Sequence, residues 1–190
     1  LRYRTLLLYF IPSYALGVYL LVEGYVLPSW LHQILPAGFA FLALLMVLKS
    51  FTERRSIRLA WTLLWMNHFW MVLAIAENEN FAWTEIGIYL SGVVFFGTLG
   101  WGLIGWMTQR HGDLGLFGYQ GYVRQHPIVA FLFLLSVLGL IGFPISPTFV
   151  GEDLLFSHIH EDQFVLAFLA ALAFVMEGVA AIRIYARLFF

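Results

Sequence analysis

Long apolar stretches recur along the 190-residue sequence, and they limit what the chain can fold into more than any other feature. A helix that crosses a lipid bilayer needs about 20 largely apolar residues. Charged residues make up 11% of the chain and hydrophobic residues 62%, whereas a soluble domain is about a quarter charged. So few charges could not cover a water-facing surface. The sequence therefore predicts an all-α, polytopic membrane protein.

Six segments are apolar enough to be transmembrane helices. The predicted spans are about Thr5–Val22, Leu35–Lys49, Ile57–Ala76, Trp83–Thr108, Pro127–Ser157 and Phe164–Phe190. The fifth is too long for one straight helix, so we expect it to be discontinuous. We interpret residues 1–190 as a single transmembrane helical domain. Because no Met precedes Leu1, we expect this domain to be either a piece of a longer polytopic protein or a trimmed complete chain.

Basic residues mark one side of the predicted bundle. Membrane proteins carry an excess of Lys and Arg in their cytoplasmic loops. If the six spans alternate in direction, every Lys and Arg falls on one side, and the opposite loops carry only acidic charges. The basic residues are Arg2, Arg4, Lys49, Arg54, Arg55, Arg58, Arg110, Arg124, Arg183 and Arg187, and the acidic ones opposite are Glu23, Glu77, Glu79, Glu85, Glu161 and Asp162. We therefore expect a multi-pass protein of a bacterial-type inner (cell) membrane, with both ends cytoplasmic.

The fifth span is interrupted by two prolines. Pro144 and Pro147 lack N–H donors and cannot continue an α-helix. A second half-helix can begin at Ser146 or Thr148, since either hydroxyl can cap its N-terminus, and Pro147 suits the first turn. Helices broken at membrane depth are tolerated where protein or water satisfies the freed backbone groups, and in transporters they mark ion or substrate sites. We therefore expect a functional site at the break.

Ionisable groups within a span are costly, so each is a functional candidate. Glu152 is expected in the first turn or so of the second half-helix, where the dipole favours an anion. Alternatively, the prolines end the helix, and Glu152 and Asp153 are loop charges at the outer face. Glu177 lacks a basic partner on its own helix, so it either pairs with another helix or is protonated. His68 can shuttle protons near neutral pH or join helices by a hydrogen bond. The candidate proton-relay residues are Glu152, Glu177 and His68.

We expect no cofactor and no metal site. The chain has no Cys, which excludes disulfides and thiolate ligands. Residues 158–162 combine His with acids, but this short segment lacks a distant fourth ligand and is predicted to lie in a solvated loop. No phosphate-binding loop, nucleophile motif or defensible pair of haem ligands occurs, and no basic patch outside the loops indicates nucleic acid. We therefore expect no chemistry in this chain alone.

The stretch "LFLLSVLGLIGFPISPTFVGEDLLF" resembles the antiporter-like subunits of respiratory complex I and of the multisubunit cation/proton antiporters. In that family an apolar helix runs into a Gly-Leu-Pro turn, and an aromatic-rich segment with an ionisable relay residue follows on a discontinuous helix. The resemblance therefore assigns the relay role to Glu152. Gly118 and Pro127 keep the spacing of the family's inner loop, and "EGVAAIRIYARLFF" resembles its next helix. The likeness is specific at residues 115–156 and weak before residue 60. It implies that the chain is the C-terminal part of a longer antiporter-like subunit.

Two positions depart from the family pattern. A lysine usually precedes the stretch that "GVYLL" resembles, and Ala15 stands there. A histidine usually occurs in the helix that "YLSGVVFF" resembles, and Ser91 stands there. The resemblance thus implies a depleted central hydrophilic axis that retains Glu152. His68, Glu177 or another subunit would then replace the missing groups.

The resemblance implies proton translocation by an antiporter-like subunit, such as one of an NADH:quinone oxidoreductase-type translocase. The expected partners are other membrane subunits, the bilayer and protons, with Na⁺ left open as the ion. The depleted axis leaves an alternative, a non-pumping coupling or scaffold subunit of an inorganic-carbon uptake or hydrogenase-type complex. A membrane anchor without an ion path is the third hypothesis.

Overall fold

A computed structural model describes residues 3–22, 28–76, 78 and 83–190 of the chain. This part is helical and contains no strand. Its helices are α1 (Tyr3–Val22), α2 (Ser29–Thr52), α3 (Ile57–Ala76), α4 (Trp83–His111), α5 (Pro127–Leu140), α6 (Pro147–Ser157) and α7 (Phe164–Phe189). Helices α1, α2, α3, α4 and α7 are each long and apolar enough to cross a membrane. The all-α, polytopic membrane fold is therefore confirmed. The total of six spans stays a prediction, with α5 and α6 as halves of the fifth.

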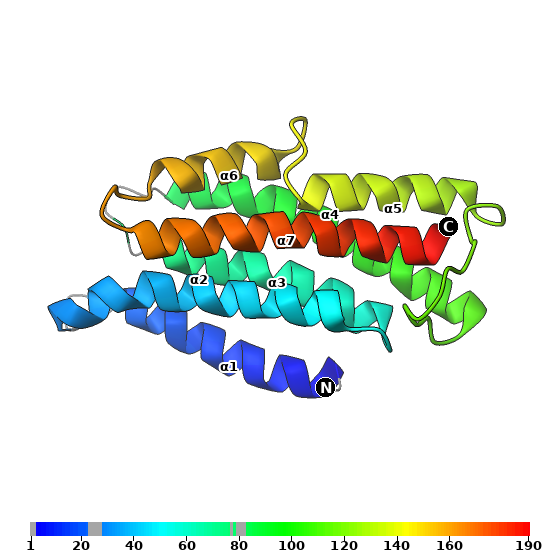
Figure 1. Cartoon of the computed structure of the whole chain (residues 1–190), viewed down its shortest axis with the longest axis horizontal. Coiled ribbons are helices and arrows are strands. Elements are labelled where there is room, and N and C mark those ends of the chain that lie inside the picture. The colour runs from blue at the N-terminus through cyan, green and yellow to red at the C-terminus, as the bar shows by residue number, and fades with distance from the viewer. Residues whose placement is uncertain (1–2, 23–27, 77, 79–82) are drawn as a thin grey trace.

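The long helices run side by side along one axis, with α5 and α6 roughly in line with each other (Figure 1). Helix α3 packs against α1, α2, α4 and α7, and most of its side chains are buried. Helices α5 and α6 both pack against α4. The start of α1 and the end of α7 lie toward the same end of the bundle (Figure 1).

Hydrogen bonds join the described basic segments at one end of the bundle. The guanidinium of Arg183 donates to the carbonyls of Ser50 and Glu53 at 3.1 and 2.8 Å. The loop between α4 and α5 covers the same end, because the N–H groups of Gln120, Tyr122 and Val123 donate to the carbonyls of residues 187, 188 and 189. These α7 carbonyls have no partner within their own helix. The predicted basic side is thus one physical end, although its position relative to the membrane stays a prediction.

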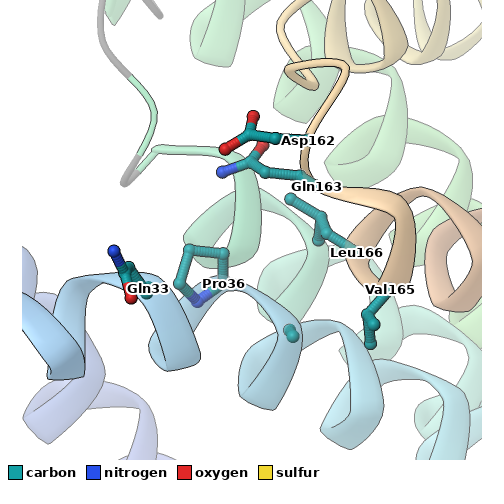
Figure 2. Close-up of a pocket in the computed structure, with 7 residues that line it drawn as sticks. Gln33, Pro36, Asp162, Gln163, Val165 and Leu166 are labelled. Carbon is teal, nitrogen blue, oxygen red and sulfur yellow. The ribbon is translucent and has the colours of Figure 1, made fainter.

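Polar side chains join the loops at the opposite end. The side-chain amides of Asn78 and Gln163 exchange two hydrogen bonds of 2.8 and 2.7 Å. A cavity of about 390 Å³ lies nearby, between α2 and the start of α7 (Figure 2). It is lined by Gln33, Pro36, Ala37, Asp162, Gln163, Val165 and Leu166. The cavity holds none of the candidate relay residues. Arg2 and the predicted acidic positions Glu23, Glu77 and Glu79 lie outside the described residues.

Two tryptophan side chains of α3 pack against glycines of α4. The indole N–H of Trp61 donates to the carbonyl of Gly97 at 2.9 Å. A Cβ atom on Gly97 would overlap the indole of Trp65, and one on Gly100 would overlap Trp61. Small residues let membrane helices approach closely, so these positions set the distance between α3 and α4.

Replacing Gly97 by Ala should therefore separate α3 from α4. We expect Gly97→Ala to lower the free energy of unfolding by about 1–3 kcal/mol, as overpacking typically does. Thermal unfolding in detergent measures the loss. Gly102→Ala is the matched control, because it sits on the same helix with nothing within 4 Å of the added Cβ. Equal stabilities of the two variants would contradict the packing role of Gly97.

A buried carboxylate holds the turn between α2 and α3. Burial alone would raise the pKa of Glu53, but hydrogen bonds from Lys49 Nζ and the Arg55 N–H, each 2.9 Å long, leave this pKa below its usual value. A carboxyl group with a lowered folded-state pKa stabilises the fold above its unfolded pKa, about 4.3. That stabilisation is lost as the pH falls through the folded-state pKa.

The thermal midpoint should consequently fall as the pH drops below about 4. Glu53→Gln should remove part of this dependence, since the amide carries no proton-linked charge. Asp113→Asn in the exposed α4–α5 loop is the control and should leave the slope unchanged. If Glu53→Gln and the unsubstituted protein lose stability in parallel, the stabilising role of this carboxylate is wrong.

Candidate functional site

The helix break consists of two capped helix ends. Helix α5 is capped just after its last residue by Gly142, which has a φ of +69°. The N–H of Phe143 donates to the carbonyl of Leu138 at 2.9 Å. This is the hydrogen bond of a Schellman cap, which requires a left-handed residue and favours Gly. Ser146 is the N-cap of α6, because its hydroxyl accepts from the N–H of Phe149 at 3.2 Å.

The break thus separates Leu140 from Pro147, with Pro144 inside it. Of the two caps left open by the sequence, Ser146 rather than Thr148 occupies the position. Pro147 is the first helical residue, where its missing N–H costs no helical hydrogen bond.

Glu152 reaches back from α6 over the break. It lies in the helix and is half-buried, whereas Asp153 is exposed, so the interpretation of both as loop charges is wrong. The first-turn placement also fails, since α6 has no acidic residue in its first turn and the dipole acts mainly there. A Cβ atom on Gly142 would overlap the Glu152 carboxyl group. Its Oε1 is buried and finds no hydrogen-bond partner among the described residues.

A chain of buried polar side chains crosses the middle of the bundle. His68 Nε2 on α3 lies 2.7 Å from Glu177 Oε1 on α7, and His68 Nδ1 lies 2.6 Å from the hydroxyl of Tyr89 on α4. Asn67 Nδ2 donates to the other Glu177 oxygen at 2.8 Å. The four side chains have no exposed surface. Of the two states that the sequence left open for Glu177, the structure shows contact with another helix.

Helix α6 brings Glu152 toward this chain. Gly151 lies directly on α4, because a Cβ atom there would come within 2.6 Å of Tyr89 Cα. Glu152 is the next residue, and its charge interacts with that of Glu177. Both carboxylates also act electrostatically on Tyr89. The structure therefore joins His68 and Glu177 directly and places Glu152 within electrostatic reach of them.

These groups can both give and take protons. A neutral imidazole has one donor and one acceptor nitrogen, so His68 can carry its proton on Nε2, 2.7 Å from Glu177 Oε1, while Nδ1 accepts from Tyr89. A phenol and a carboxyl group can likewise serve as donor or acceptor. Histidine changes its charge near neutral pH more readily than other side chains. The arrangement is suited to passing a proton between helices.

Sequence reasoning missed Asn67 and Tyr89. Asn67 was visible as a polar neighbour of His68 within a span. Tyr89 gave no signal, because tyrosines near the ends of spans commonly anchor helices at the interface.

The positions that depart from the family pattern do not face this chain of side chains. Ala15 and Ser91 are both exposed on the outside of the bundle, and the Ser91 hydroxyl donates to the carbonyl of Ile88 at 2.7 Å. Neither residue belongs to the buried group of His68, Glu177 and Tyr89, and the depletion of a central axis stays a prediction.

The His/acid segment between α6 and α7 shows no metal geometry. His158 Nδ1 lies 2.8 Å from the Leu154 carbonyl, and Nε2 lies 3.4 Å from Glu85 Oε2. Among the described residues, no group of three or more His, Asp or Glu side chains could hold a metal ion.

Several known proteins match part of the chain. NADH-ubiquinone oxidoreductase chain 4 of Dictyostelium citrinum is 40% identical over 75 residues, which are 40% of this chain and 18% of the relative. NADH-quinone oxidoreductase subunit M of Rickettsia prowazekii is 32% identical over 112 residues, covering 55% and 22%. Subunit N of Moorella thermoacetica is 32% identical over 114 residues, covering 50% and 24%.

These relatives confirm the resemblance to the antiporter-like subunits of complex I. The matched segments span less than a quarter of each relative's own length. No family model and no solved structure matches the chain.

A methyl group at Gly142 should displace the Glu152 carboxyl group. We expect Gly142→Ala to lose about 1–2 kcal/mol from its left-handed backbone, plus a further cost from the overlap. Gly112→Ala is the matched control, because its φ is +78° but nothing lies within 4 Å of the added Cβ. Thermal unfolding in detergent compares the two. An equal loss in both variants would show that the Glu152 contact contributes nothing.

Proposed function

We propose that this chain is part of a proton-conducting, antiporter-like membrane subunit of an NADH-quinone oxidoreductase-type complex. Protons would pass through Glu152, His68 and Glu177. The observation that carries the proposal is the buried Glu152 Oε1, which has no partner among the described residues and lies at a helix break. The named relatives support the assignment to such a complex.

A purely structural role accounts poorly for these side chains. Leaving a buried acceptor without a donor costs about 1–3 kcal/mol, so the Glu152 oxygen lowers the stability of the fold. A role in function would explain why such a group is present. Replacing a buried ion pair by well-packed apolar residues is often neutral or stabilising. The His68–Glu177 contact is therefore not needed merely to hold α3 against α7. Ionisable groups at this depth point to an ion path.

The transported ion in this proposal is the proton. Hard cations such as Na⁺ are bound by oxygen ligands. The central group among the buried polar side chains is instead an imidazole, that of His68, which lies between a phenol and a carboxylate. An imidazole can accept and release a proton at near-neutral pH.

The proposal also orients the path. Helix α6 runs from the break to the end of the bundle where the acidic loops lie. If the basic end is cytoplasmic, as the charge bias favours, Glu152 lies toward the outer side and His68–Glu177 near mid-membrane. Other membrane subunits would then supply or receive the proton at the inner side.

Glu152→Gln should stop proton flux through the assembled protein in membrane vesicles. The amide keeps the shape of the side chain but cannot exchange a proton, and we expect a loss of about 10²-fold, the scale of general acid–base contributions. Asp153→Asn removes the neighbouring exposed carboxylate and should keep full flux. Intact assembly is checked by size-exclusion chromatography. Unchanged flux in Glu152→Gln would contradict the proposal and favour a non-pumping scaffold subunit.

A further inference from the structure

We infer that Tyr89 is a further proton-relay residue, and that its hydroxyl carries protons between Glu152 on α6 and the His68–Glu177 pair. This inference rests on the proposed function and names the group that connects its two parts. Neither the sequence pattern nor the family resemblance assigned a role to this tyrosine.

The position of Tyr89 supports a connecting role. Its hydroxyl lies 2.6 Å from His68 Nδ1, and the side chain has no exposed surface. On its other side, Gly151 packs against Tyr89 Cα and Cβ, which brings the adjacent Glu152 to the same part of α4. The titratable groups that act on the phenol come from three helices: His68 from α3, Glu152 from α6 and Glu177 from α7.

Glycine at position 151 is what makes this approach possible. A Cβ atom there would meet Tyr89 Cα, Cβ and Cδ2 at 2.5–2.7 Å, so any larger residue would push α6 away from α4. One turn along α4, a Cβ atom on Gly92 would overlap Thr148 in the first turn of α6. The two glycines hold the half-helix that carries Glu152 against the helix that carries Tyr89.

The transfer conserves protons and charge without forming a phenolate. Protonated Glu152 passes its proton toward the Tyr89 oxygen as the Tyr89 O–H proton moves to His68 Nδ1, 2.6 Å away. The His68 Nε2 proton then moves to the Glu177 carboxylate. Glu152 ends as the anion and Glu177 as the neutral acid, while His68 remains neutral with its proton on the other nitrogen. Reorientation of the hydroxyl and exchange of the His68 tautomer reset Tyr89 and His68, and the cycle closes when Glu177 releases its proton and Glu152 takes up another.

Electrostatics favours this exchange between the two acids. The charges of Glu152 and Glu177 disfavour one another, so a single negative charge divided between the two positions is better tolerated than two. When a proton moves from one carboxyl group to the other, the summed negative charge of the two groups stays constant. Both charges act electrostatically on Tyr89.

Tyr89→Phe tests the inference in vesicles that contain the assembled protein. It removes only the hydroxyl, so we expect proton flux to fall about 10²-fold while assembly is kept. Tyr119→Phe, at an exposed position on the α4–α5 loop, is the matched control and should keep full flux. Full flux in Tyr89→Phe would overturn the inference.

Fluorotyrosine placed at position 89 separates proton transfer from structural support. Fluorine makes the phenol more acidic with little change in shape, so proton transfer through the hydroxyl should change the size of the flux and alter the flux–pH profile. A hydroxyl that merely braces His68 would leave the profile unchanged, and that result would overturn the inference. Glu152→Gln, measured alongside, identifies which claim fails. If it abolishes flux while Tyr89→Phe does not, only the Tyr89 assignment is wrong; if neither reduces flux, the proposed function is wrong.

Discussion

The contact between His68 and Glu177 gives this apolar bundle its polar centre. These two ionisable groups, which are costly to bury in a bilayer, lie 2.7 Å apart although more than 100 positions separate them in the sequence. Their contact offsets part of the cost of burying both groups, and Asn67 donates a hydrogen bond to the second oxygen of Glu177. Tyr89 and Glu152 gain their significance from this pair, because they extend it toward the broken helix.

Glycine brings these side chains within reach of one another. The transmembrane helices have little hydrophobic driving force to associate, so close packing and interhelical hydrogen bonds must hold them together. Gly97 admits the tryptophans of α3, Gly151 lets α6 lie on Tyr89, and Gly142 leaves room for the Glu152 carboxyl group. The same small residues therefore determine both the packing of the bundle and the continuity of the proposed path.

Much of this fold could be predicted from the sequence, since length and apolarity define the membrane helices and Pro144 and Pro147 define the break. What the sequence could not give was the rotation of each helix about its own axis. A helix that is apolar on every face carries no amphipathic pattern to show which face meets a neighbour. For that reason the partner of Glu177 was left open, the contact of Tyr89 with His68 was missed, and the exposure of Ala15 and Ser91 could not be predicted.

The central claim is that protons pass through the buried pair, and Glu177→Gln tests it most directly. The amide matches the carboxylate in shape and can still bond to Asn67 and His68, so the contact between α3 and α7 should survive. Proton flux in vesicles that contain the assembled complex is the measurement. The account predicts that flux is lost while assembly and thermal stability stay close to those of the unsubstituted protein. Full flux in an intact complex would contradict it and leave the pair as a structural tie alone.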